Sequence, residues 1–136
     1  MAPADPDAQL GALQLAWLGD AVWELHQRLR QCHRPARSKH LHQAVVEEVK
    51  AEAQARALRI LEPLLRQDER EQVRRGRNRA GRGPRPGEAG CYGQATGFET
   101  MLGWLFLRNP GRLAELLDRL EETPAPLYPQ DHEPLP

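Results

Sequence analysis

The sequence predicts an all-α fold. Apolar residues recur at spacings of three and four along most of the chain, and no stretch alternates apolar and polar residues as a β-strand does. The chain contains no internal repeat and no sustained heptad. At 136 residues it is long enough for one helical core and too short for two. We therefore expect one helical domain over residues 10–122, preceded by a flexible N-terminus (1–9) and followed by a proline-rich tail (123–136).

The first helix is expected over about Leu10 to Gln31. The sequence CHRPAR follows as a loop, because Pro35 prevents the helix from continuing. A second helical pattern runs from Lys39 to about Leu65, and it forms either one long helix or two helices joined near Lys50. Pro63 marks a break or a final turn in this segment.

Three further helices and one loop complete the expected fold. Asp68 to Arg77 is short, highly charged and helical in pattern. Asn78 to Gly93 contains five glycines and two prolines, so we expect a long loop there with no regular element. The apolar pattern of residues 94–107 predicts a buried helix from Gln94 to Leu107. The apolar spacing of residues 110–122 predicts a final amphipathic helix from Pro110 to Glu122.

Two acids stand out because their helices are apolar nearly all round. Asp20 lies in LQLAWLGDAVWELHQRL (13–29) and Glu99 in TGFETMLGWLFL (96–107), and such helices are usually buried. A buried carboxylate is costly unless it is paired, hydrogen-bonded or bound to a metal. We therefore expect the two carboxyl groups to meet and share a cation, and Mg²⁺ is the ion that prefers one or two carboxylates with several waters.

Other interpretations of the acids remain open. Each acid can instead pair with a buried arginine, and spacing alone does not decide between the two arrangements. Glu24 lies one turn after Asp20 on the same face and is either a further ligand or, the interpretation we favour, a structural hydrogen-bond acceptor.

A block of arginines carries the second candidate site. Residues 74–85 contain six arginines and no acid, although the whole chain has a formal net charge of zero. Local basic charge of this kind indicates a polyanionic partner, because arginine binds phosphate oxygens bidentately. The alternative is an ordinary solvated charged loop.

Several function classes are disfavoured. Cys32 and Cys91 are isolated, so we expect neither a zinc site nor a disulfide framework. Trp17, Trp23 and Trp104 are expected in the core rather than as stacking platforms. No segment approaches 18 consecutive apolar residues and the N-terminus does not resemble a signal peptide, so we expect a soluble cytoplasmic protein with no membrane partner.

Three spaced motifs resemble a known family. The segment LAWLGDAVWEL (15–25) resembles the LGDAV signature of the ribonuclease III catalytic domain. The segment ATGFETMLGWLFL (95–107) resembles its second signature, FEAxxGxxYL. RRGRNRAG, followed by CYGQATGFE, resembles the Mini-ribonuclease III subfamily, whose members lack a double-stranded-RNA-binding domain. The segment KHLHQAVVEEVKAEAQARAL is also similar to that subfamily, and the match covers about residues 10–120.

The resemblance implies roles for particular residues. Asp20 and Glu99 match the family's metal-binding catalytic acids. The chain departs from the larger ribonuclease III enzymes at Ala16 and Thr96, where those enzymes carry further acids, and Mini-ribonuclease III is alike in lacking them. The RGRN match and its flanks supply the candidate RNA-binding residues: Arg74, Arg75, Arg77, Asn78 and Arg79.

The resemblance also implies a function. It implies a ribonuclease III-like helical bundle that forms a homodimer and uses Mg²⁺ to cleave structured double-stranded RNA, with large-subunit ribosomal RNA precursor as the substrate. The competing hypothesis is a non-catalytic RNA-binding or ribosome-assembly protein on the same scaffold. Because such a protein is expected to have lost at least one acid, the presence of both Asp20 and Glu99 favours the enzyme.

Overall fold

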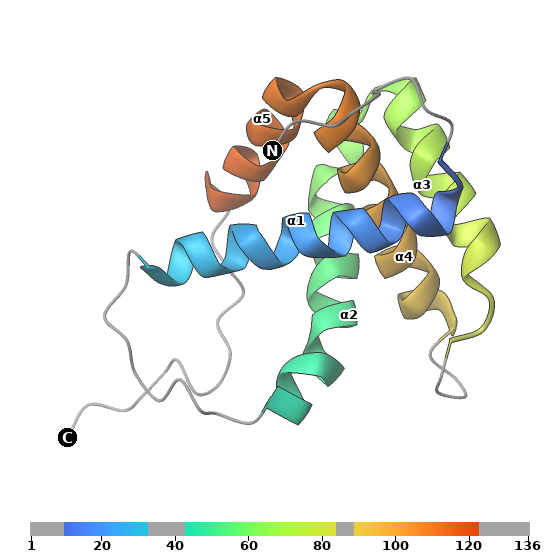
Figure 1. The fold of residues 1–136 in the computed structure, drawn as a ribbon, viewed down its shortest axis with the longest axis horizontal. Helices are drawn as coiled ribbons and strands as arrows, with labels where there is room; N and C mark the ends of the chain where they lie inside the picture. Colours follow the sequence, from blue (N-terminus) through green and yellow to red (C-terminus); the bar gives the residue numbers. More distant parts are fainter. Residues whose placement is uncertain (1–9, 33–42, 84–88, 123–136) are drawn as a thin grey trace.

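The structure is a computed structural model of the chain and describes residues 10–32, 43–83 and 89–122; for residues 43–49 and 89 it describes the backbone alone. The described residues contain helices and no strand, which confirms the all-α fold class. Figure 1 shows α4 between α2 and α3, with α1 crossing them. None of the described helices is long and apolar enough to span a membrane. The elements in chain order are α1 (Ala12–Cys32), α2 (Gln43–Leu61), the 3-10 turn η1 (Glu62–Leu64), α3 (Gln67–Ala80), α4 (Ala89–Arg108) and α5 (Pro110–Glu122).

The core is built around α4, which contacts α1, α2, α3 and α5. The apolar side chains at its centre are almost completely buried, and each contributes about 1.5–3 kcal/mol relative to an exposed position. Trp23 from α1 belongs to this core and packs edge-on against the ring of Phe98 on α4, with the ring centroids 5.3 Å apart. Trp104 packs against the core from a half-buried position. The most deeply buried side chains of α4 are Phe98, Met101, Leu102 and Leu105.

Glycines let α1 and α3 approach α4 to backbone contact. A Cβ atom added at Gly19 of α1 would lie 1.8 Å from the Glu99 carbonyl oxygen, and one added at Gly103 of α4 would lie 2.0 Å from the Leu15 carbonyl oxygen. On the other side of α4, a Cβ at Gly76 of α3 would lie 2.3 Å from the hydroxyl of a threonine on α4. These three glycines therefore set how closely the helices cross.

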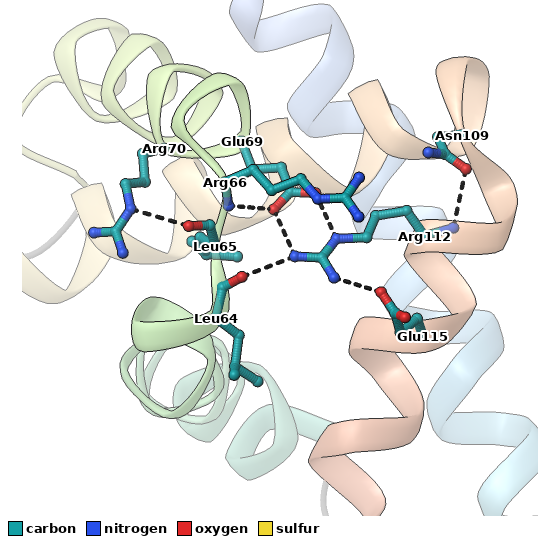
Figure 2. Close-up of polar contacts among 8 residues, drawn as sticks. All are labelled: Leu64, Leu65, Arg66, Glu69, Arg70, Asn109, Arg112 and Glu115. Atoms are coloured by element: carbon teal, nitrogen blue, oxygen red, sulfur yellow. Dashed lines mark hydrogen bonds and ion pairs between the residues drawn. The ribbon is translucent and has the colours of Figure 1, made fainter.

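A buried ion pair connects the start of α3 to α5 (Figure 2). The Glu69 carboxylate accepts hydrogen bonds from Arg112 Nε at 2.7 Å and Nη2 at 3.0 Å, and from the Arg66 backbone N–H at 2.7 Å. Burial alone would raise the pKa of Glu69, but these donors lower it below its ordinary value. Arg112 also donates to the Leu64 carbonyl oxygen at 2.8 Å and pairs with Glu115. The cluster fixes the orientation of α3 and therefore of the arginines along it.

The helix boundaries agree with the sequence in most places and differ in one. The second helix is continuous through Lys50 from residue 43 to 61, and Pro63 lies in the 3-10 turn that follows it. The glycine-rich stretch 78–93 is partly helical, which corrects the expected long loop: α3 runs to Ala80 and α4 already begins at Ala89. Each helical glycine costs about 1 kcal/mol, and contacts elsewhere along α4, such as the hydrogen bond from Arg59 of α2 to Gln94 at 3.1 Å, oppose that cost. Gly81 has a φ of 71°, and α3 ends there.

The expectation that α1 is buried all round is wrong. Trp17 is 81% exposed and Leu25 is 59% exposed, and Leu13 and Leu29 are about half exposed. The side chain of Asp20 is 38% exposed, so it lies at the edge of the core rather than inside it. The reason is that only one side of α1 packs on α4, and the described residues place no helix against the other side.

Some expectations concern residues that the structure does not describe. The N-terminal segment 1–9, the loop at Pro35, the expected start of the second helix at residues 39–42 and the tail 123–136 all lie outside the described ranges.

Candidate active site

The structure brings Asp20 and Glu99 together. Asp20 follows Gly19, whose backbone rests against the backbone of Glu99 where α1 crosses α4. The two carboxyl groups lie close enough for Asp20 to raise the pKa of Glu99, as expected for acids that share a site. The absence of a side chain at Gly19 therefore also keeps the two acids close together, because a side chain there would push α1 away from α4.

Helix α2 supplies two polar partners that the sequence interpretation missed. Lys50 forms an ion pair with Asp20, and its Nζ atom lies 3.8 Å from Glu24 Oε1. Gln54, one turn further along α2, donates a hydrogen bond from Nε2 to Glu99 Oε2 at 2.9 Å. The available signals were the four-residue spacing and the rarity of lysine, since Lys39 and Lys50 are the chain's only lysines.

Burial and neighbouring charges control the protonation of Glu99. Burial is the main cause that raises its pKa from the ordinary value of 4.5 to about 7; the adjacent Asp20 acts in the same direction, whereas Gln54 and Lys50 oppose the shift. Burial would lower the pKa of Lys50, but its hydrogen bond and charge interaction with Asp20 raise it overall, so Lys50 is a cation at neutral pH. The site therefore already contains one positive charge.

The donor set fits a hard divalent cation. The Oδ1 atom of Asp20 is buried, and apart from its ion pair with Lys50 no regular hydrogen bond reaches it from the described residues. Carboxylate oxygens such as those of Asp20 and Glu99 are the ligands that Mg²⁺ prefers, with water completing the shell. Among the described residues no group of three or more His, Cys, Asp or Glu side chains is arranged to hold a metal, so the site offers two carboxylates.

Glu24 lies beside this pair rather than in it. It forms an ion pair with Arg28 at 3.4 Å in addition to its contact with Lys50, and 43% of its side chain is exposed. Glu24 therefore contacts two cationic side chains, and its interpretation as a structural hydrogen-bond acceptor stays a prediction.

Comparison with known proteins identifies the family. The Ribonuclease III domain matches residues 13–110. Mini-ribonuclease 3 from a Synechococcus species is 52% identical over 115 residues, covering 85% of this chain and 83% of the relative. The chain belongs to the Mini-ribonuclease III family. Mini-ribonuclease 3 of Thermosynechococcus vestitus is 45% identical over 118 residues, covering 87% of this chain and 78% of that protein.

The fold comparison agrees with this assignment. A crystal structure of a protein from Fusobacterium nucleatum superimposes with a TM-score of 0.70 at 22% identity, covering 88% of this chain and 98% of that chain. As a member of the Mini-ribonuclease III family, this protein is an endoribonuclease that acts on RNA, and the ribonuclease III family is generally dependent on divalent metal ions.

Ala16 and Thr96, the two positions at which further acids were considered and the sequence has none, are both buried. Ala16 lies one turn before Asp20. The Thr96 hydroxyl donates to the Tyr92 carbonyl oxygen of its own helix at 3.0 Å. Neither position adds a ligand to Asp20 and Glu99.

The five candidate RNA-binding residues lie on the second half of α3. The expected helix already included Arg74, Arg75 and Arg77. The correction concerns Asn78 and Arg79, which were expected in the loop and are helical. Arg74 pairs with Glu71 on the same helix. Arg75 donates to Gln72 Oε1 at 2.8 Å and lies 3.5 Å from the Leu10 carbonyl oxygen, so it holds the chain just before α1. The side chains exposed at the end of the helix are Arg77, Asn78 and Arg79.

A basic groove lies between the end of α2 and α3. Its volume is about 460 Å³, and its floor is apolar, with Leu58, Leu65 and Val73. The polar residues that line it are Glu62, Arg70, Arg74, Arg77 and Asn78. This groove is separate from the acid pair and lies on the side of α3 that carries the arginines.

Proposed function

We propose that this member of the Mini-ribonuclease III family hydrolyses phosphodiester bonds in structured double-stranded RNA with Mg²⁺ held by Asp20 and Glu99. We further propose large-subunit ribosomal RNA precursor as its substrate. The observation that carries the proposal is the proximity of these two carboxyl groups at the crossing of α1 and α4, where the backbone of Gly19 rests against that of Glu99. Mg²⁺ bound there would activate a water molecule and stabilise negative charge on the phosphodiester.

The protein's own groups prepare the site for this reaction. Gln54 donates to one oxygen of Glu99 and so orients its carboxyl group. Because the pKa of Glu99 is about 7, this carboxyl group carries a proton part of the time at neutral pH, and that proton must leave before both oxygens are available to a cation. Asp20 lies at the exposed edge of the site, where a phosphate group can approach it.

The direct test is cleavage of a duplex RNA by the purified protein. We expect internal cuts with Mg²⁺ and none when the ion is removed by a chelator. An RNA that is bound but remains intact with Mg²⁺ would instead support the assembly-protein alternative. Comparing a precursor of large-subunit ribosomal RNA with an unrelated duplex of equal length would test the proposed substrate.

The exposed arginines of α3 are proposed to bind the RNA backbone. Replacing Arg77 and Arg79 with glutamine should weaken duplex binding and reduce the salt dependence of the binding constant, because each lost phosphate contact lowers the slope by about one. Binding is measured at several salt concentrations. Arg66→Gln, at the other end of the same helix, is the matched control and should keep the wild-type slope. An unchanged slope in the double variant would show that these arginines are only solvated.

We propose that the exposed apolar side of α1 is covered by a second copy of the chain. This side carries Trp17 and Leu25, and Trp17 precedes Asp20 by one helical turn. A two-fold dimer formed there would present two identical acid sites, which matches the two antiparallel strands of an RNA duplex.

The dimer prediction is tested by Trp17→Glu. Because this change puts a charge in the apolar contact, we expect a dimer for the wild type and a folded monomer for the variant, measured by light scattering. Leu64→Glu is the control, since Leu64 is also an exposed apolar residue but lies on η1. A wild-type monomer that still cuts both strands would contradict the proposal.

A further inference from the structure

The acid site contains a cation of its own, Lys50. Its ammonium group pairs with Asp20, lies 3.8 Å from Glu24, and interacts with the charge of Glu99. Only 17% of the Lys50 side chain is exposed. One ammonium group therefore lies among three carboxyl groups, two of which are the proposed metal ligands.

The residue type at this position is unusual for the chain. Of its 19 basic residues only two are lysines, so arginine is the usual choice in this sequence. An arginine binds a carboxylate through a planar fork, whereas a lysine ammonium is a compact point charge on a flexible stem. A compact, flexible charge is the kind that can leave one carboxylate for another.

Glu24 provides the second partner for such a move. Its Oε1 atom is 3.8 Å from Nζ, which is near enough for attraction but longer than a direct hydrogen bond. The ammonium therefore needs to move only a short distance to exchange Asp20 for Glu24.

We propose that Lys50 is the resident counter-ion of the acid pair and competes with the divalent cation for Asp20, with Glu24 accepting the ammonium group when the cation binds. This inference rests on the proposed metal-binding role of Asp20 and Glu99. Lys50 holds the two carboxyl groups together in the metal-free protein and lowers their affinity for the ion. Lys50 and Glu24 are positioning residues in this scheme and are not metal ligands.

The scheme predicts opposite effects for the two residues on metal affinity. Removing the ammonium removes a repulsive charge a few ångströms from the ion, so Lys50→Met should bind Mg²⁺ or Mn²⁺ at least about tenfold more tightly than the wild type. Glu24→Gln should bind the ion more weakly, because the displaced ammonium loses its second partner. Lys50→Arg keeps the positive charge and should not show the increased affinity for the ion.

The experiment is calorimetric titration of RNA-free protein with Mg²⁺ and, separately, Mn²⁺. A double-mutant cycle separates the scheme from a simple attraction between Glu24 and the ion: the effect of Glu24→Gln should disappear in a Lys50→Met background. The increase in melting temperature caused by the ion is a second measure and should be larger for Lys50→Met. If Lys50→Met is poorly folded, Lys50→Gln replaces it, since its amide can still donate to Asp20.

The outcomes distinguish this inference from the proposed function. Unchanged or weaker ion binding by both neutral Lys50 variants, in a protein that cleaves RNA with Mg²⁺, would overturn the counter-ion role and leave the enzyme's function intact. An equal effect of Glu24→Gln with and without Lys50 would overturn the exchange. If no variant binds either ion and no RNA is cut, both proposals are wrong.

Discussion

Replacing Asp20 with asparagine should leave a folded protein that binds duplex RNA but no longer cleaves it. Asparagine keeps the shape of the side chain and removes the charge proposed to hold Mg²⁺, so we expect cleavage to fall by at least about a hundredfold. Stability should change by less than about 1 kcal/mol, because Asp20 is partly exposed and Lys50 keeps Glu24 and Glu99 as partners. RNA binding should survive, since the arginines of α3 lie on a different helix.

The Asp20 prediction requires three measurements on the same sample: thermal unfolding, RNA binding and single-turnover cleavage with Mg²⁺. Asp118→Asn is the matched control, because Asp118 is an exposed acid on α5 and should retain wild-type cleavage. A variant that unfolds would show that Asp20 is mainly structural. Cleavage at nearly the wild-type rate would remove Asp20 from the mechanism.

The same variant has a characteristic pH dependence of stability. The folded pKa of Glu99, about 7, is above its ordinary value of 4.5, so its contribution to stability is complete below about pH 4.5 and is lost as the pH rises through 7. Asp20 is one cause of this shift. Asp20→Asn should therefore lose less stability than the wild type between about pH 5 and 8, measured by denaturant unfolding.

The acid pair could be predicted from the sequence because both of its members are charged residues in otherwise apolar surroundings. Asp20 and Glu99 interrupt apolar helical patterns, and such patterns can be read locally. Lys50 and Gln54 could not be found in the same way, since their stretch of α2 is rich in alanine and charged residues and reads as an ordinary amphipathic helix. Their role depends on which face of α2 turns toward α1 and α4, which is a property of the tertiary structure.

The errors in the prediction have identifiable physical causes. An apolar pattern indicates that a surface will be covered, but it does not say whether the same chain or another molecule covers it. For this reason the exposed Trp17 was placed in the core. The glycines at 90 and 93 predicted a loop, because local propensity omits tertiary contacts elsewhere in this part of α4, such as the hydrogen bond from Arg59 of α2 to Gln94. The pair of Glu69 and Arg112, 43 residues apart, is invisible to any local pattern.

Replacing Gly19 with alanine should destabilise the fold and abolish cleavage through a single methyl group. The added Cβ would lie 1.8 Å from the Glu99 carbonyl oxygen and 2.6 Å from its carbonyl carbon, and backbone atoms inside a helix cannot move aside cheaply. We expect α1 and α4 to separate at a cost of about 3 kcal/mol, which lowers the melting temperature by about 10 °C. Because Asp20 follows Gly19 directly, the separation also moves the two carboxyl groups apart.

The matched control for Gly19→Ala is Gly90→Ala on α4. A Cβ at Gly90 meets nothing within 4 Å, so alanine there should stabilise the helix by up to about 1 kcal/mol and leave cleavage unchanged. Gly103→Ala, whose Cβ would lie 2.0 Å from the Leu15 carbonyl oxygen, should behave like Gly19→Ala. Cleavage is measured at a temperature at which thermal unfolding shows each variant to be folded, so that a lost site is separated from a lost fold. A folded Gly19→Ala protein with full activity would show that the acids do not need this close crossing, and the site would then have to form by a different approach of α1 to α4.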